Sequence, residues 1–295
     1  MRAFFVIALL VGCSSSDRAV PGLASRPSSD AGAAIDSRPE ETAALPVRDD
    51  SATLASCDET WTWSTAEPFA PGASGDSEAS VAVSADGATV AWRVERAVLW
   101  VDRGADGSYG RHRGIDLPVA LDGIALEPDG LGLVFVSSED GQLREARRAS
   151  RDEDFVSFDE LPFVPLRIQA TAAGETIESP ALGDGRLVFL RRGAASVTMW
   201  EAVREGSRFG AATRLFAPRL TRPSGLSSDG RTLFSWDEDS NLTQVWARTT
   251  TVDPFREVRT LPARRDARPT ADCRRLFFLA GTEPSTWDVA IAEQK

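Results

Sequence analysis

The sequence predicts an all-β fold of five similar units that close into a ring. One observation is a repeated Asp-Gly turn followed by an apolar strand, first seen in Ser84-Ala-Asp-Gly-Ala-Thr-Val-Ala-Trp92. Another is an aromatic residue four or five residues behind the glycine position of each turn, and a third is a strand-like segment near the N-terminus. Periods of about 40–50 residues with several short strands each are typical of β-propellers. We therefore predict a five-bladed β-propeller whose last blade is completed by an N-terminal strand.

The turns mark the units. They begin at Asp86, Asp129, Asp184 and Asp229, each followed by a glycine (Gly87, Gly130, Gly185 and Gly230). A degenerate fifth copy, without the glycine, begins at Asp272. An Asp-Gly pair supplies the positive φ angles of a tight hairpin turn, and the β-branched and aromatic run behind it predicts a strand. The intervals between turns are 43, 55, 45 and 43 residues. The long interval includes residues 166–177, where a Thr-Ala-Ala-Gly run predicts an inserted loop. The alternative is six blades, with a degenerate blade within residues 160–178.

Aromatic residues repeat in register with the turns. The strand behind each turn ends on Trp92, Phe135, Phe189, Phe234 and Phe277 or Phe278. The next strand carries Trp100, Trp200, Trp246 and Trp287, with Leu143 in the second unit. An aromatic residue in the outermost strand follows at Tyr109, Phe155, Phe209 and Phe255. These residues predict the core of each blade.

The two ends of the chain are expected to meet in one blade. The fifth unit stops before its outer strand, and Ser64-Thr-Ala-Glu-Pro-Phe69 parallels Thr250-Thr-Val-Asp-Pro-Phe255. Donating this strand would remove open sheet edges. Cys57 precedes the donated strand and Cys273 lies in the blade that receives it, so a disulfide in an oxidising compartment is predicted. The alternative is two unpaired thiols.

The N-terminus predicts secretion and lipid anchoring. Residues 1–12 hold one arginine, an apolar run and small residues, as secretory signals do. Leu10-Val-Gly-Cys13 resembles the bacterial lipobox, which implies diacylation of Cys13 and, with Ser14 behind it, an outer-membrane address. The alternative is an ordinary signal peptide with a chance cysteine. Residues 13–56 lack aromatic residues and are expected to form a disordered tether, with the propeller over residues 57–295.

The repeat resembles the TolB-like β-propeller family, whose units read Ser-x-Asp-Gly followed by an apolar strand that ends in Phe. The resemblance covers residues 58–295 and includes Asp253-Pro-Phe255, a motif found before the units of many propeller lipoproteins of Gram-negative bacteria. It implies a periplasmic or surface-facing envelope protein.

Composition excludes several kinds of chemistry. A net charge of −11 without a basic stripe argues against nucleic-acid binding. Lys295 is the only lysine, so Schiff-base chemistry has no lysine except the terminal one. His112 is the only histidine, so a two-histidine metal site lacks a ligand, and a Ser-His-Asp triad would have to use His112, which lies in the polar segment Arg111-His-Arg113. Residues 75–77 lack the context of an esterase nucleophile, and residues 237–241 lack the Gly and Glu of a calcium loop. Arginine pairs such as Arg147-Arg148, Arg191-Arg192, Arg264-Arg265 and Arg274-Arg275 are expected on solvated faces.

These observations predict a lipid-anchored envelope β-propeller that binds a protein or peptide, or acts as a scaffold, without catalysis. We expect a monomer with no cofactor and no metal ion, held at the membrane by its lipid anchor only. One alternative is a glycan-acting hydrolase or lyase with two or three carboxylates at the mouth of the channel. A further alternative is a purely structural surface lipoprotein.

Overall fold

The computed structural model describes residues 57, 62–72, 78–117, 120–155, 164–165, 168–169, 174–183, 185–206, 208–215, 221–281 and 286–295. The chain divides into two units, Met1–Asp49 and Asp50–Lys295, and all described residues belong to the second. The predicted signal peptide, Cys13, the tether up to residue 56, Asp184 and residues 75–77 lie outside the described residues. No described helix is long and apolar enough to cross a membrane.

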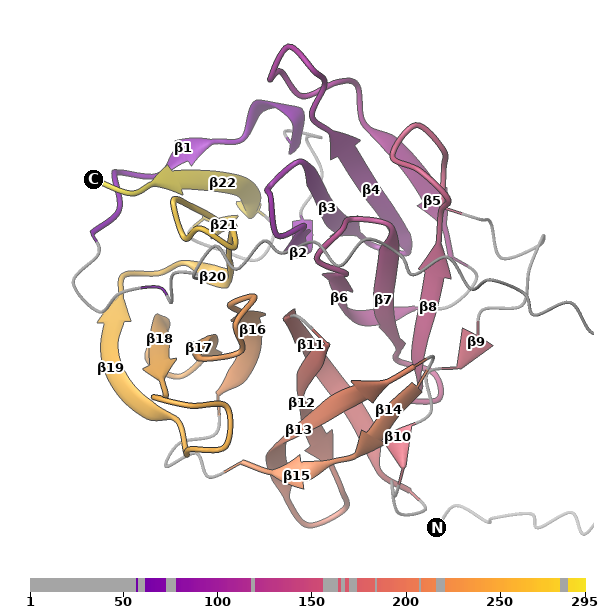
Figure 1. Ribbon diagram of the computed structural model, residues 1–295, viewed down its shortest axis with the longest axis vertical. Coiled ribbons are helices and arrows are strands. Elements are labelled where there is room, and N and C mark those ends of the chain that lie inside the picture. Colours follow the sequence, from indigo (N-terminus) through magenta and orange to yellow (C-terminus); the bar gives the residue numbers. More distant parts are fainter. Residues whose placement is uncertain are drawn as a thin grey trace, which may run out of the picture. The chain divides into compact units, whose positions relative to one another are not determined.

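The described residues form an all-β fold of five sheets arranged around a common centre (Figure 1). Blade 1 runs outward through β2 (Glu78–Val83), β3 (Thr89–Val94), β4 (Ala97–Asp102) and β5 (Arg113–Asp116). Blade 2 runs through β6 (Leu121–Leu126), β7 (Gly132–Ser137), β8 (Leu143–Arg147) and β9 (Val164–Pro165). Neighbouring strands within both blades are antiparallel.

Blade 3 is the most elaborate. It consists of β11 (Thr176–Gly183), β12 (Arg186–Arg192), β13 (Val197–Glu205), β14 (Arg208–Ala211), β15 (Thr213–Arg214) and β10 (Ile168–Gln169). Blade 4 runs through β16 (Arg222–Leu226), β17 (Thr232–Asp237), β18 (Leu242–Ala247) and β19 (Arg256–Leu261). Blade 5 runs through β20 (Arg265–Pro269), β21 (Arg275–Ala280), β22 (Asp288–Glu293) and β1 (Glu67–Pro68), and a 3-10 turn, η1 (Ala70–Gly72), follows β1.

The structure confirms five blades. Within the long interval, β9 pairs with β8 of blade 2 and β10 pairs in parallel with β14 of blade 3. The described strands of this stretch are therefore the outer edges of two blades, and they form no sixth sheet.

The N-terminal strand closes the ring, as predicted. Glu67 and Pro68 pair with Ile291 and Ala290 of β22, and Trp63 forms an antiparallel bridge with Gln294. Phe69 continues the closure, because its ring contacts Tyr109 of blade 1 and Phe277 of blade 5 edge-on. The outer strand of blade 5 and the contact with blade 1 thus come from the same short segment.

The hairpin turns differ from the predicted conformation. Gly87 has a φ of 66°, whereas Asp86 has no positive φ. The Asp86 carboxylate instead accepts hydrogen bonds from Ser84 Oγ (2.7 Å) and the Ala88 amide (2.9 Å), and the Gly87 amide donates to the Ser84 carbonyl (2.9 Å). The aspartate is therefore favoured for its side-chain acceptor and the glycine for its φ. The same bonds recur around Asp229 and Asp272.

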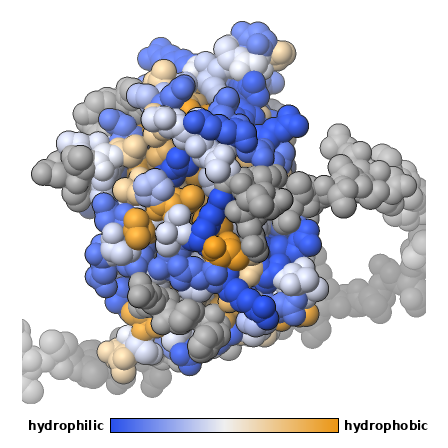
Figure 2. Space-filling model, turned by 90° about the vertical axis from the view of Figure 1, so that its left-hand side faces the viewer, coloured by the Kyte–Doolittle hydropathy of each residue, from blue (hydrophilic) through white to orange (hydrophobic). Residues whose placement is uncertain are grey.

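Side chains from the predicted positions fill the space within and between blades. Trp92, Phe135, Phe189, Phe234 and Phe277 are all fully buried. The outer aromatic residues Phe155 and Phe255 are buried too, but they precede β9 and β19 instead of lying in these strands. On the side of the molecule shown in Figure 2, hydrophobic residues gather only in small groups among hydrophilic ones.

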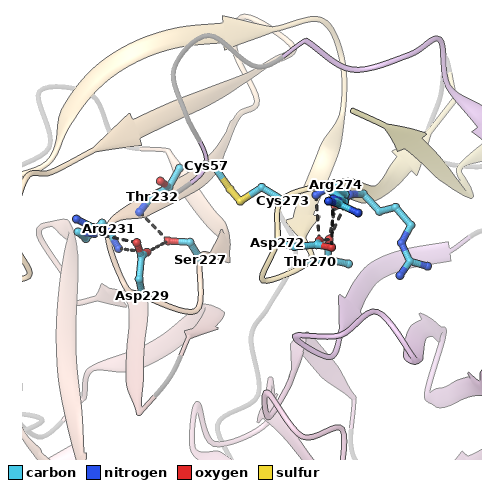
Figure 3. The surroundings of a disulfide bond; sticks show 10 residues. Cys57, Ser227, Asp229, Arg231, Thr232, Thr270, Asp272, Cys273 and Arg274 are labelled. Carbon is cyan, nitrogen blue, oxygen red and sulfur yellow. Dashed lines mark hydrogen bonds and ion pairs between the residues drawn. A yellow bond between two sulfur atoms is a disulfide. The ribbon is translucent and has the colours of Figure 1, made fainter. Parts of the chain in front are cut away.

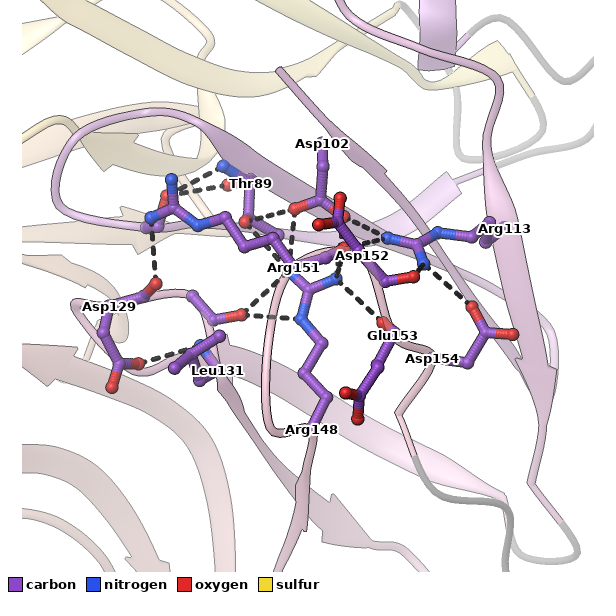
Figure 4. A network of polar contacts seen from close by, with 12 residues as sticks. Thr89, Asp102, Arg113, Asp129, Leu131, Arg148, Arg151, Asp152, Glu153 and Asp154 are labelled. Atoms are coloured by element: carbon purple, nitrogen blue, oxygen red, sulfur yellow. Dashed lines mark hydrogen bonds and ion pairs between the residues drawn. The ribbon is translucent and has the colours of Figure 1, made fainter. Parts of the chain in front are cut away.

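Buried arginines join neighbouring blades, which corrects the prediction that the arginine pairs are solvated. Arg148 is 4% exposed, and it donates to both carboxylate oxygens of Asp102 in blade 1 (2.7 Å each) and to the Gly130 carbonyl (Figure 4). Its guanidinium also lies over the Phe155 ring. Arg191 and Arg264 are likewise buried, while Arg147, Arg192 and Arg274 are exposed. In the pairs Arg147-Arg148, Arg191-Arg192 and Arg264-Arg265, one arginine is therefore buried and has a structural role.

The same arrangement recurs between blades 3 and 4. Arg248 lies over the Phe255 ring, binds both carboxylate oxygens of Glu201 (2.5 and 3.0 Å), and donates to the Gly230 carbonyl (2.8 Å). Each arginine thus fixes its own turn and the third strand of the preceding blade. Bidentate pairs of this kind hold two groups in a defined geometry.

Between blades 2 and 3, Arg204 pairs with Glu127, and the buried Glu127 makes the stability of the fold depend on pH. Burial raises the pKa of Glu127 to about 7, which Arg204 partly offsets and Glu145 reinforces. The folded-state pKa of Glu127 lies above the ordinary value of 4.5, so the folded protein holds this proton more tightly than the unfolded chain does. The stability that this proton contributes is therefore fully present at low pH and is lost as pH rises through about 7. We expect the free energy of unfolding to fall by about 2–3 kcal/mol from this group between pH 5 and pH 8.

Urea denaturation at the two pH values measures this effect. Glu127→Gln should remove the difference that Glu127 contributes, whereas Glu153→Gln, at an exposed carboxylate, should leave the pH dependence unchanged. Identical pH profiles for Glu127→Gln and the wild type would contradict the assignment.

Candidate functional site

The five innermost strands carry a ring of β-bulges at one end of the channel. Each register shift lies near the start of its strand: between Glu78 and Ser80, Leu121 and Gly123, Glu178 and Ala181, Pro223 and Gly225, and Arg265 and Arg268. Bulges redirect side chains, and they are over-represented beside functional sites. At two of them a non-glycine residue has positive φ, namely Ser179 (51°) and Asp266 (55°). We call this end of the channel the channel mouth.

The channel mouth contains a polar cavity of about 30 Å³. Polar side chains from all five inner strands line it: Ser80, Asp122, Ser179, Ser224, Asp266 and Arg268. Backbone strain at Ser179 and Asp266 is part of what places these groups around one space. This cavity is our candidate functional site.

Both aspartates of the cavity already bind the neighbouring blade. Asp266 of blade 5 accepts hydrogen bonds from Ser80 Oγ (2.6 Å) and the Val81 amide (2.7 Å) of blade 1. Asp122 of blade 2 accepts one from the Ser179 amide of blade 3 (3.0 Å). These carboxylates therefore contribute to the interfaces between blades.

Arg268 crosses the channel from blade 5. Its Nη2 donates to the carbonyl oxygens of Ile124 (2.9 Å) and Pro180 (3.2 Å), which belong to blades 2 and 3, and lies 3.4 Å from Asp266. Arg268 is 5% exposed, and burial lowers its pKa, with Asp266 opposing that shift. A positive charge is therefore fixed at the base of the cavity.

Two more arginines surround the opening. Arg265 is stacked on Trp287, with its guanidinium 3.7 Å from the ring centre. Arg222 lies between Glu238 (3.0 Å) and Asp122 (3.9 Å). Burial lowers the pKa of Arg265, and the nearby charge of Arg222 acts in the same direction while acidic neighbours oppose it.

A second hollow of about 120 Å³ extends the site outward between blades 3 and 4. It shares Arg222 and Trp236 with the cavity, and Leu190, Val197 and Thr221 form part of its wall. We call it the side cleft. It places apolar and polar contacts directly beside the charged cavity.

The opposite end of the channel is narrow and largely apolar. Its hollow of about 20 Å³ is lined by residues such as Val83, Leu126, Leu182 and Leu226. The Ala85 amide donates to the Pro128 carbonyl, and the Ala271 amide donates to the Ala85 carbonyl, so the turns that follow adjacent inner strands are bonded to each other here. Polar ligand-binding groups are thus concentrated at the channel mouth.

The predicted disulfide lies among the turns and away from the channel mouth. Cys57 and Cys273 are joined across 216 residues, with Cα atoms 5.4 Å apart (Figure 3). Cys273 occupies the glycine position of the fifth turn and has a φ of 52°. Its amide donates to the Thr270 carbonyl (2.8 Å), as the amides of Gly87, Gly130 and Gly230 donate to the equivalent carbonyls of their turns. The turn residues and the disulfide therefore shape the scaffold and do not line the cavity.

Other candidates from the sequence lie elsewhere. His112 packs beside Trp92, at 6.2 Å between ring centres. In the loop of residues 237–241, the Asp237 carboxylate accepts bonds from the Asp239 amide and Ser240 Oγ, which is a local turn. Among the described residues, no group of three or more His, Cys, Asp or Glu side chains could hold a metal ion.

Sequence reasoning missed the arginines of the cavity, although one signal was present. Four residues before the turn aspartate, the first four units have the small residues Ala82, Ala125, Pro180 and Gly225. The fifth unit has Arg268 at this position. A large charged residue at a position that is otherwise small indicates a specific role.

No family model matches the chain, and no curated protein matches it either. Solved structures similar to it include a luciferin-regenerating enzyme, which is 9% identical with a TM-score of 0.44 over 78% of this chain and 95% of that one. A β-propeller domain from Myceliophteria thermophila is 12% identical, with a TM-score of 0.43 over 72% of each chain.

TolB from Acinetobacter baumannii is also similar, at 12% identity and a TM-score of 0.44 over 75% of this chain and 56% of TolB. The similar structures thus include a protein named as an enzyme as well as a protein of the family that the repeats resemble. At these identities and TM-scores, they carry no argument about ligand or activity. The five-bladed β-propeller fold itself follows from the sheets described above.

Proposed function

We propose that this protein is a lipid-anchored, extracytoplasmic β-propeller that binds a protein or peptide partner at its channel mouth without catalysis. The observation that supports this proposal is that the polar cavity adjoins the side cleft, with which it shares Arg222 and Trp236. A small charged cavity beside a longer mixed groove suits an extended chain whose terminal group enters the cavity. The polar groups that line the cavity come from all five blades. A small number of polar groups that converge on one space is typical of ligand-binding sites.

The disulfide supports a location outside the cytoplasm, because disulfides persist in oxidising compartments. Lipidation of Cys13, with Ser14 behind it, would place the propeller at the outer membrane. A flexible tether of 43 residues would give the propeller an r.m.s. reach on the order of 35–40 Å. That reach allows a membrane-anchored propeller to contact partners across the nearby envelope.

The alternative of a glycan-acting enzyme depends on the carboxylates at the channel mouth. Glycoside cleavage needs one carboxyl group as acid and a second as nucleophile or base. Asp122 and Asp266 line the cavity, but each accepts a backbone amide hydrogen bond from the next blade. Their engagement between blades favours a positioning role over catalysis and supports the binding proposal.

In-cell cross-linking of the tagged full-length chain, followed by mass spectrometry of envelope fractions, tests the proposal. We expect one partner to be captured repeatedly, and its yield to fall at least tenfold in Cys13→Ala, which lacks the anchor, and in Arg222→Gln, which alters the channel mouth. Arg274→Gln should capture the same partner as the wild type, because Arg274 is exposed beside the fifth turn. Equal capture by Arg222→Gln and Arg274→Gln would contradict binding at the channel mouth.

A further inference from the structure

The channel-mouth cavity has unused hydrogen-bond donors. The Arg268 guanidinium makes its three polar contacts, to Ile124, Pro180 and Asp266, through Nη2. Among the described residues, nothing accepts a hydrogen bond from its Nη1, and its Nε is buried without an acceptor. Burying a donor of a charged group without a partner is unfavourable, because the group loses its hydrogen bonds to water. Such a group indicates a missing acceptor.

Arg265 adds a second guanidinium with unused hydrogen-bond donors to the same cavity, although the charges of Asp266 and Glu238 act on it. Its guanidinium contacts the Trp287 ring, and no described residue accepts a hydrogen bond or forms an ion pair with it. A guanidinium stacked on an aromatic face keeps its N–H edge available in a fixed orientation. The aromatic contact therefore holds Arg265 ready to bind a planar anion.

The acceptors that face these arginines are occupied. Asp266 binds Ser80, Val81 and Arg268, and Asp122 binds the Ser179 amide and lies near Arg222. Glu238 pairs with Arg222 at the rim. After these contacts, the cavity has a surplus of donors, which a ligand that only accepts hydrogen bonds would complement.

The volume of the cavity limits the size of the anion that it can bind. A volume of about 30 Å³ corresponds to roughly two water molecules. The two oxygens of a carboxylate fill this space, and their planar geometry matches the guanidinium edge. The rest of a larger ligand would then lie in the side cleft, which begins at Arg222 and Trp236.

We propose that the channel-mouth cavity binds a carboxylate group through Arg265 and Arg268, and that this group is the free C-terminus of the peptide partner. The peptide assignment rests on the proposed function, whereas the carboxylate assignment rests on the cavity alone. A small organic acid offers the same chemistry, and the experiment below separates the two sources.

The first arm compares acetate with acetamide, its uncharged counterpart, by thermal unfolding of the full-length chain at constant ionic strength. At 100 mM, acetate should raise Tm by roughly 2–4 °C, as expected for a ligand that binds only the folded state, while acetamide should not. Equal effects of acetate and acetamide would overturn the carboxylate assignment.

The second arm measures binding of random heptapeptide pools, coupled through their N-termini, in free-acid and C-terminally amidated forms. The free-acid pool should bind at least tenfold more tightly, because the amide loses the charge-assisted pair with arginine. If both pools bind equally, the peptide-binding function stands and the C-terminal carboxylate assignment fails. If acetate stabilises the protein but neither pool binds, the cavity is a small-acid site and the peptide-binding function fails.

Three variants test whether the rise in Tm with acetate depends on Arg265 and Arg268. Arg265→Gln, at a partly exposed residue, and Arg268→Leu should both abolish the Tm rise with acetate, and Arg274→Gln should retain it in full. Circular dichroism checks that each variant is folded, and Arg265→Gln remains decisive if Arg268→Leu does not fold. An unchanged acetate response in Arg265→Gln would overturn the proposal.

Discussion

Removal of the disulfide is expected to lower the free energy of unfolding by about 5 kcal/mol, because the bond closes a loop of more than 200 residues in the unfolded chain. Cys57→Ala/Cys273→Ala is the variant, and urea denaturation measures the loss. Beyond its effect on the unfolded chain, the bond fastens the segment before Trp63 to the fifth turn. Weaker closure of the ring should therefore appear as increased hydrogen exchange in β1 and β22.

A matched variant separates the cross-link from the strain in the turn. Cys273 has a φ of 52° where three of the other turns have glycines at 66–74° and Gly185 has 63°. Cys57→Ala/Cys273→Gly should therefore be about 1 kcal/mol more stable than Cys57→Ala/Cys273→Ala. Equal stabilities of the two double variants, or of either one and the wild type, would contradict this explanation.

Replacement of Arg148 by Met should destabilise the fold by about 3–5 kcal/mol, because it leaves Asp102 partly buried without its bidentate partner. Arg113 also pairs with Asp102 and retains part of the compensation. The Gly130 carbonyl and Thr89 Oγ1 lose donors in the same variant. Urea denaturation measures the loss, which concerns the interface between blades 1 and 2.

Two variants control for this result. Arg274→Gln removes an arginine whose side chain is 78% exposed and should change stability by less than about 0.5 kcal/mol. Arg148→Met/Asp102→Asn should recover part of the loss, because it no longer leaves a carboxylate without its partner. A loss for Arg148→Met as small as that for Arg274→Gln would show that the buried pair does not hold the blades together.

The repeated parts of the fold could be predicted from the sequence because they depend on local patterns. The turn at Asp86 and the aromatic residue at Trp92 recur at nearly constant intervals, and each repeat predicts one blade. The closure could be predicted from the likeness between residues 64–69 and 250–255, and the disulfide from the positions of Cys57 and Cys273.

Contacts between blades could not be predicted in this way. The sequence predicts a solvated face for Arg147 and Arg148 alike, because two adjacent arginines do not show which of them is buried. In the structure Arg147 ends β8 and is exposed, whereas Arg148 follows it and is buried. The cavity depends on bulges that bring Asp266 of blade 5 beside Ser80 of blade 1, 186 residues away in the chain. Register between distant strands determines these contacts, and short-range periodicity contains no information about it.

Site-specific photo-cross-linking in cells is the most direct test that the channel mouth is the binding face. A photoreactive residue at Asp239, which lines the side cleft, is compared with one at Arg274 beside the fifth turn. Both positions are exposed, and both side chains lie in loops. We predict that Asp239 captures the partner and Arg274 does not. Capture from Arg274 alone would place the partner on the turn face and contradict the assignment of the channel mouth as the binding site.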